Sequence, residues 1–156
     1  MITFEDNEKT WARLDFQILL HGGCKPYSDY TALEKDVAWL KKESYPVIEC
    51  DCSKWNDKKT ILDGLHNKLK FLGSYGDNWD AIQSALNEME LDENGVVVIL
   101  DKIDSMNFKL AETLVDVFLT SSRRHLIFSK RLLLLIKVEN RGIAFNQFAP
   151  VTFHWY

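Results

Sequence analysis

The sequence predicts an α/β fold of three layers, in which a mostly parallel sheet is flanked by helices. Two apolar runs, residues 96–100 and 132–138, have the length and composition of strands that are buried on both faces. Segments with a helical spacing of apolar residues alternate with such strands, which is typical of a parallel sheet with crossover helices. The chain has 156 residues, of which 46% are apolar, so it can form one domain with an ordinary core.

The first third of the chain is expected to contain two strands with a helix between them. Apolar and polar residues alternate over residues 11–20, which predicts a strand with one buried face, and a Gly-Gly pair then predicts a turn. Residues 31–42 have the apolar spacing of an amphipathic helix, which Pro46 would not allow to continue. Residues 47–52 predict a second, short strand.

Two further helices are expected before the first central strand. Asp57 is placed to cap a helix that continues to about residue 72, and Gly73 is placed to end it. Asp77 or Asn78 is expected to cap the next helix. The apolar stripe of that helix consists of Trp79, Ile82, Ala85, Leu86 and Met89.

The last part of the chain continues the same alternation. An Asn-Gly turn leads into the strand at 96–100, and Asn107 is placed to cap a helix that continues to about residue 122. The strand at 132–138 follows, and residues 151–155 are expected to add a final edge strand.

We expect a single domain over residues 1–156. Within it, residues 1–46 form an N-terminal extension of one strand and one helix, residues 47–138 form the main α/β unit, and residues 139–156 form a C-terminal segment.

Composition excludes several classes of protein. No apolar run approaches the ~20 residues that a membrane-spanning helix needs, and residues 1–15 lack the apolar core of a signal peptide, so we expect a cytoplasmic protein. The three cysteines, Cys24, Cys50 and Cys52, are an odd number without framework spacing, which favours buried reduced thiols. The four histidines form no spaced ligand motif, so we expect neither a metal nor a cofactor.

The charge is unevenly distributed. The whole chain has a net charge of −4, but residues 77–116 contain two basic and ten acidic residues, whereas residues 117–156 contain six basic residues and one acidic residue. An acidic surface repels nucleic acid and attracts a basic partner. The alternative is that these acidic residues only decorate solvated helix faces.

Sequence motifs give little support for an enzyme. There is no Gly-rich phosphate loop after a strand and no G-x-S-x-G nucleophile motif. Asp101 and Asp104 follow a central strand, where α/β proteins often place functional carboxylates, but no second acid, nucleophile or metal partner stands at a set spacing from them. We therefore expect a protein that is not an enzyme.

The most informative segment is the helix that begins near Asn78. The face opposite its apolar stripe carries no lysine or arginine, which is unusual for a surface helix and favours a cationic partner. The residues of this polar face are Asp80, Gln83, Ser84, Asn87 and Glu88. The alternative is that Asp77 and Asp80 only interact favourably with the helix dipole.

The segment Tyr-Gly-Asp-Asn-Trp-Asp-Ala at residues 75–81, preceded by a helix containing Leu65-His66, resembles the barstar family of ribonuclease inhibitors. The resemblance extends over residues 47–138, and residues 1–46 look like the strand and helix added in longer barstar-like proteins. It implies a three-layer α/β fold and a bacterial inhibitor. The founding member of the family places an acidic helix and the adjacent loop in the cationic active site of a ribonuclease.

The resemblance also implies which residues bind the partner. Tyr75, Gly76, Asn78 and Asp80 match the contact residues of the family. Gln83 stands where the founding member has a tryptophan, Ser84 where it has its most important aspartate, Ser74 where it has a tyrosine, and Thr120 where it has a peripheral glutamate. We add Asn87 and Glu88 from the same helix face. Structural alternatives remain for three of these residues, since Tyr75 can pack over the helix start, Asn78 can be a cap and Gly76 can be required for a positive φ.

Together these features predict a cytoplasmic immunity protein that is monomeric alone. It would form a 1:1 complex with a basic nuclease toxin that is secreted or delivered, and we expect this toxin to be a ribonuclease. It would contact neither nucleic acid nor membranes. The alternative is a module of the same fold that binds a basic partner other than a toxin.

Overall fold

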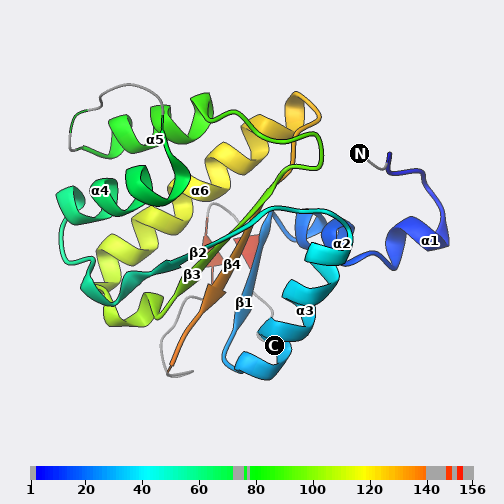
Figure 1. Cartoon of the computed structure of the whole chain (residues 1–156), viewed down its shortest axis with the longest axis horizontal. Helices are drawn as coiled ribbons and strands as arrows, with labels where there is room; N and C mark the ends of the chain where they lie inside the picture. The colour runs from blue at the N-terminus through cyan, green and yellow to red at the C-terminus, as the bar shows by residue number, and fades with distance from the viewer. Residues whose placement is uncertain (1–2, 72–75, 77, 140–146, 149–150, 153–156) are drawn as a thin grey trace.

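The protein is built around a four-stranded parallel sheet with the strand order β1-β4-β3-β2 (Figure 1). The computed structural model describes residues 3–71, 76, 78–139, 147–148 and 151–152. The strands are β1 (Cys24–Tyr27), β2 (Val47–Asp51), β3 (Val96–Asp101) and β4 (Leu132–Lys137). Val98 pairs with Ile48 on one side and with Leu134 on the other, and Leu134 pairs with Cys24. The predicted parallel sheet is confirmed, with β3 and β4 at its centre.

Helices cover both faces of this sheet (Figure 1). One face packs against α4 (Lys58–Leu69), α5 (Trp79–Glu88) and α6 (Phe108–Ile127), and the other packs against α2 (Leu14–Leu20) and α3 (Tyr30–Lys42). Side chains alternate along each strand, so Val98 and Leu134 face the first group of helices and Val97 and Leu133 face the second. Every residue of β3 and β4 is buried, as the continuous apolar runs predicted.

The predicted strand over residues 11–20 is wrong. This region forms the short helix α1 (Glu8–Trp11) and then α2, and the first strand is β1. The alternating pattern required Asp15 to face solvent, but Asp15 is fully buried and lies three residues before the buried Ile18, which is a helical spacing. β1 contains Pro26, which is tolerated because β1 is an edge strand.

Several element ends differ from the prediction. Helix α4 ends at Leu69, where Lys70 adopts a left-handed φ of 52°, and the predicted terminator Gly73 lies outside the described residues. Helix α6 continues to Ile127 rather than to about residue 122. Near the C-terminus, β6 (Val151–Thr152) pairs with β5 (Gln147–Phe148) in a separate antiparallel sheet and adds no edge to the main one. Two short 3₁₀ turns, at Cys52–Lys54 and Ile103–Ser105, follow β2 and β3.

A buried carboxylate joins the N-terminal helices to the rest of the fold. The Arg13 guanidinium donates to both oxygens of Asp15, at 3.0 Å each. The Tyr45 hydroxyl donates to the same carboxylate at 2.6 Å, and Arg131 Nη1 lies 3.4 Å from it. Burial and the hydrogen bond to Asp15 raise the pKa of Tyr45. Asp15 therefore connects α2 with the residue before Pro46 and with the start of β4.

We predict that Asp15→Ala lowers the free energy of unfolding by about 3–5 kcal/mol, because it leaves Arg131 and Tyr45 buried without their carboxylate. The measurement is urea unfolding at neutral pH. A suitable control is Asp63→Ala, which removes an exposed carboxylate that pairs with Lys59 on the surface of α4. This control should change the free energy by less than about 1 kcal/mol. Equal effects of the two substitutions would contradict the role of Asp15.

Two adjacent serines of α6 offer a second test. The Ser122 hydroxyl donates to the Leu132 carbonyl at 2.7 Å, whereas the buried Ser121 hydroxyl has no hydrogen-bond partner among the described residues. We predict that Ser121→Ala is neutral or stabilising, because it removes an unsatisfied polar group. Ser122→Ala should cost about 1 kcal/mol in the same urea unfolding measurement. A larger loss in the free energy of unfolding for Ser121→Ala than for Ser122→Ala would contradict this assignment.

Candidate protein-interaction surface

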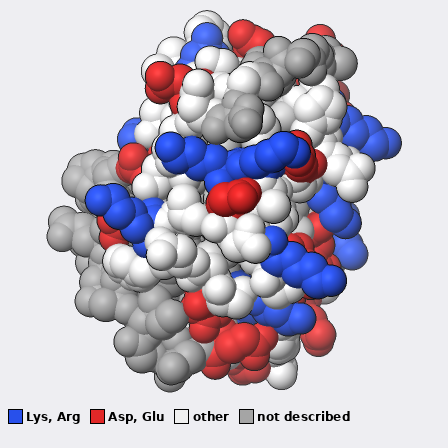
Figure 2. All heavy atoms as spheres, turned by 90° about the vertical axis from the view of Figure 1, so that its left-hand side faces the viewer, with Lys and Arg blue, Asp and Glu red and all other residues white. Residues whose placement is uncertain are grey.

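Surface charge is mixed over most of the helical face. Figure 2 shows the side of the molecule on the left of Figure 1, where lysine and arginine side chains lie beside acidic ones. On α4, for example, Lys59 pairs with Asp63 at 3.2 Å. Helix α5 differs, since its ten residues include Asp80 and Glu88 and no lysine or arginine. The acidic surface predicted for the middle of the chain is therefore best defined on α5.

Helix α5 is held firmly at both ends. Asn78 is its N-cap, and the Asn78 side chain accepts a hydrogen bond from the Ala81 N–H at 2.8 Å. Near the other end, His125 Nε2 of α6 lies 2.8 Å from the Leu86 carbonyl; since a carbonyl only accepts, the ring nitrogen donates. The predicted apolar stripe is confirmed. Its buried members are Ile82, Ala85 and Leu86, and Trp79 and Met89 are partly buried against the same core.

The predicted polar residues share the opposite face of α5. Asp80, Ser84 and Glu88 are exposed and lie at intervals of four residues, so they form one line along the helix. Gln83 and Asn87 are half-buried beside this line, and Gln83 Nε2 donates to Asn87 Oδ1 at 3.2 Å. The face can thus present two carboxylates, a hydroxyl and an amide pair to one partner.

The residues around the start of α5 have different roles. Tyr75, like Ser74 and Asp77, lies outside the described residues. Asn78 has the structural role of a helix cap. Gly76 is exposed, and among the described residues the nearest atom to an added Cβ is Asn78 Nδ2, at 3.8 Å. The interpretation that Gly76 needs a positive φ stays a prediction, because this angle involves Tyr75.

Thr120 lies on a separate helix from the other predicted contact residues. It is exposed on α6, where its hydroxyl donates to the Asp116 carbonyl at 3.0 Å and lies 3.4 Å from Arg123 Nη2. Its immediate surroundings are thus basic as well as polar, in contrast to the face of α5.

A hollow at the end of α5 was not predicted from the sequence. It lies between the end of α4, with the two residues that follow it, and the last turn of α5. Its lining consists of Leu69, Lys70, Phe71, Ala85, Glu88, Met89 and Glu90. Its volume is about 140 Å³. A lining that combines apolar side chains with glutamates can accommodate the stem and the charged head of a lysine or arginine. No sequence signal indicated this site, because the lining comes from two helices that meet only in the folded protein.

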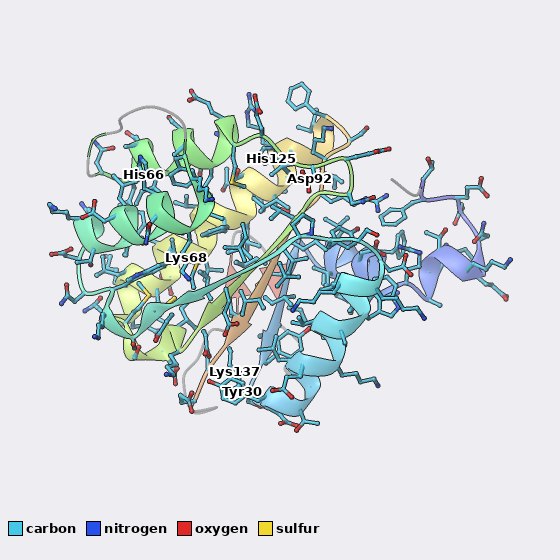
Figure 3. All side chains as sticks on the ribbon, in the orientation of Figure 1. Tyr30, His66, Lys68, Asp92, His125 and Lys137 are labelled. Atoms are coloured by element: carbon cyan, nitrogen blue, oxygen red, sulfur yellow. The ribbon has the colours of Figure 1, made fainter. Side chains whose placement is uncertain are left out.

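Asp92 extends the acidic region beyond α5. It is exposed in the loop between α5 and β3, near the end of α6 that carries His125 (Figure 3). The acidic side chains thus continue from Asp80 along α5 and into this loop.

The residues considered for catalysis have structural partners instead. The Tyr30 hydroxyl donates to Asp101 at 2.9 Å, and the Asp104 carboxylate accepts from the Glu139 N–H at 3.0 Å. The three cysteines are free and buried, and burial raises the pKa of the Cys50 thiol to about 11, far from that of a reactive thiolate. Within the described residues, no group of three or more His, Cys, Asp or Glu side chains could hold a metal ion. Nor does that part of the chain contain a helix long and apolar enough to cross a membrane.

The position of α5 can be tested through its cap. We predict that Asn78→Ala lowers the free energy of unfolding by about 1 kcal/mol and speeds amide hydrogen exchange in the first turn of α5. The control is Asn67→Ala on α4, which replaces an exposed asparagine inside a helix and should be neutral or slightly stabilising. Unchanged exchange in α5 of the Asn78 variant would show that the cap does not fix the helix start.

Comparison with known proteins agrees with the motif. The family model described as Barstar (barnase inhibitor) matches residues 45–146, and this family consists of non-enzymatic inhibitors, so the chain is not an enzyme. No curated protein matches the sequence.

Solved structures share the fold at low identity. The crystal structure of Cdc6p from Pyrobaculum aerophilum has a TM-score of 0.56 and 10% identity, over 91% of this chain and 41% of that one. A chain in the structure of Drosophila ORC bound to GC-rich DNA and Cdc6 has a TM-score of 0.57 and 15% identity, over 90% and 51%. The chain therefore spans about half, or less, of those chains, and the likeness concerns the fold alone. The family match covers more than half of this chain and includes α4, α5 and α6: the protein belongs to the barstar family.

Proposed function

We propose that this protein is a cytoplasmic immunity protein that binds a basic, barnase-type ribonuclease in a 1:1 complex and occludes its active site with α5 and the segments beside it. Family membership supports the class of partner. The observation that carries the proposal for this chain is the exposed face of α5, which presents the carboxylates of Asp80 and Glu88 on a helix that contains no lysine or arginine and is fixed at both ends.

The mechanism is occlusion by charge mimicry. A ribonuclease binds the phosphates of RNA with cationic side chains, and the carboxylate of Asp80 would pair with one of these in place of a phosphate. Because α5 is already ordered, little conformational entropy is lost when the enzyme binds. The acidic surface would also speed the encounter of the two proteins, and this effect would weaken with added salt.

The chain departs from the family pattern in a way that favours a shifted contact. Ser84 is exposed and offers no carboxylate where the founding member has an aspartate, and Gln83 is half-buried and bonded to Asn87. Glu88 and Glu90 lie instead at the hollow beyond Ala85. We infer that the charge needed for binding is supplied nearer the C-terminal end of α5, with a lysine or arginine of the enzyme entering the hollow.

The departure from the family pattern at Ser84 also favours a second candidate function. The missing carboxylate at Ser84 is consistent with a basic partner that is not a nuclease toxin. Such a protein would bind the face of α5 without being inhibited in any hydrolytic activity, so inhibition assays separate the two functions.

The test measures binding and inhibition of a barnase-type ribonuclease by calorimetry and by hydrolysis of a fluorescent RNA. We predict that Asp80→Arg weakens binding at least about tenfold, because it places a cation against a cationic site. The control, Asp63→Arg, makes the same charge change on the exposed face of α4 and should have little effect. Ser84→Asp should tighten binding, since the site is exposed and the new carboxylate continues the line from Asp80 to Glu88.

Unchanged affinity of the Asp80 variant would rule out this face of α5. Tight binding that leaves RNA hydrolysis unaffected would favour the second function.

A further inference from the structure

We propose that the groove between β2 and α4 binds an extended segment of a partner protein, which adds a strand to the free edge of the sheet and carries basic side chains at alternate positions. This surface shares no residue with the exposed face of α5, so the proposal is independent of the inhibitor function.

The first observation is an open strand edge. Among the described residues, β2 is the last strand of the sheet and pairs only with β3. Val97, the partner of Val47, donates its N–H to the Pro46 carbonyl. In a parallel ladder with this register, the main-chain polar groups of residues 46, 48 and 50 point toward β3. The main-chain groups of Val47, Glu49 and Asp51 therefore point outward. Within the described part of the chain, no hydrogen bond engages those of Glu49.

The second observation is a groove along this edge. A hollow of about 420 Å³ is lined on one side by Glu49, Cys50 and Asp51 of β2. Gly64, Asn67 and Lys68 line the other side; their spacing of three and four places them on one face of α4. Figure 3 shows Lys68 between α4 and β2. Volumes of this size are typical of binding sites, and strand-to-helix grooves of this kind accept added peptide strands in several domain families.

Trp55 shapes the inner wall of this groove. Its indole lies so close to α4 that a Cβ at Gly64 would be 2.5–2.7 Å from three of its ring atoms. Gly64 thus allows the indole to pack flat against the helix, with only 8% of Trp55 exposed. The result is an apolar wall beside a polar strand edge.

The two sides of the edge select different side chains from the added strand. Ile48 and Cys50 pack on the side of the sheet that α4 covers. Val47 packs on the side that α3 covers. Because side chains alternate along a strand, Glu49 and Asp51 lie on the same side as Val47. Residues of the added strand that point toward α4 meet Trp55 beside Asn67 and Lys68, and an apolar residue that packs on the indole suits this side. Residues that point the other way meet the exposed carboxylates of Glu49 and Asp51. The hydrogen bond from the Ser53 N–H lowers the pKa of Asp51, which keeps it ionised.

These charges exclude the simplest alternative occupant. A second copy of the chain, paired antiparallel through β2, would place acidic side chains opposite acidic side chains, which is destabilising. An alternating basic and apolar segment satisfies both sides of the edge at once.

The test uses the acetylated and amidated peptide Lys-Val-Lys-Val-Lys with the full-length protein, monitored by NMR of the backbone amides and of the Trp55 indole. We expect shifts confined to residues 47–51, 55 and 64–68. Two control peptides are Glu-Val-Glu-Val-Glu and the basic peptide N-methylated at every residue, which cannot complete the strand ladder in either direction; both should bind at least about tenfold more weakly.

Variants separate main-chain pairing from charge. Glu49→Pro removes the outward N–H without removing a bond to β3, and it should weaken binding of the basic peptide about tenfold. Glu49→Gln keeps the N–H and should have a smaller effect, while Asp80→Arg on α5 should have none. The proposal would be overturned by shifts elsewhere in the protein or by no shifts at all. It would also be overturned by equal binding of the N-methylated peptide, by preference for the acidic peptide, or by a dimer formed through β2.

Discussion

The structure depends on one constraint, which is that a parallel sheet must be covered by helices on both faces. Helices α4, α5 and α6 cover one face, but they leave Val97, Ile99, Leu133 and Leu135 on the other. Those four side chains pack against residues of the N-terminal extension, including Ile18, Tyr27, Leu33 and Leu40. The extension precedes the segment that matches the family model, yet it completes the core of that segment. The buried carboxylate of Asp15 fixes this arrangement, since it bonds both to Arg13 beside α2 and to Arg131 before β4.

The same constraint determines how rigid the interaction surface can be. With both faces of the sheet covered, α6 has a fixed position, and His125 of α6 can hold the last turn of α5 through the Leu86 carbonyl. The carboxylates of Asp80 and Glu88 are therefore presented from a helix that does not need to order on binding. Preorganised charges of this kind contribute more to recognition than the same charges on a flexible loop, because fewer rotational states are lost.

The sequence predicted those parts of the fold that local chemistry determines. Asp57, Asn78 and Asn107 are the caps of α4, α5 and α6, because a cap needs only a side-chain oxygen and a nearby N–H. The N-terminal strand was misplaced because the burial of Asp15 depends on Arg131, which is far away in the chain. The polar face of α5 was predictable, because it follows from helical spacing within one short segment. The hollow at Ala85 and the groove at β2 were not, because each is formed by segments that meet only after folding.

The fold alone says little about function, and the carboxyl end of the sheet shows why. Ligands of parallel α/β sheets usually bind beyond this edge, so it is the first place to search in a protein with this topology. In this protein Tyr30 and Lys137 lie next to each other at this edge (Figure 3). The Tyr30 hydroxyl lies 2.9 Å from Asp101 and 3.0 Å from Glu139, and the buried Lys137 ammonium lies 4.0 Å from the centre of the Tyr30 ring. These groups bind one another, whereas α5 and β2 present exposed carboxylates at the surface, where a partner protein can reach them.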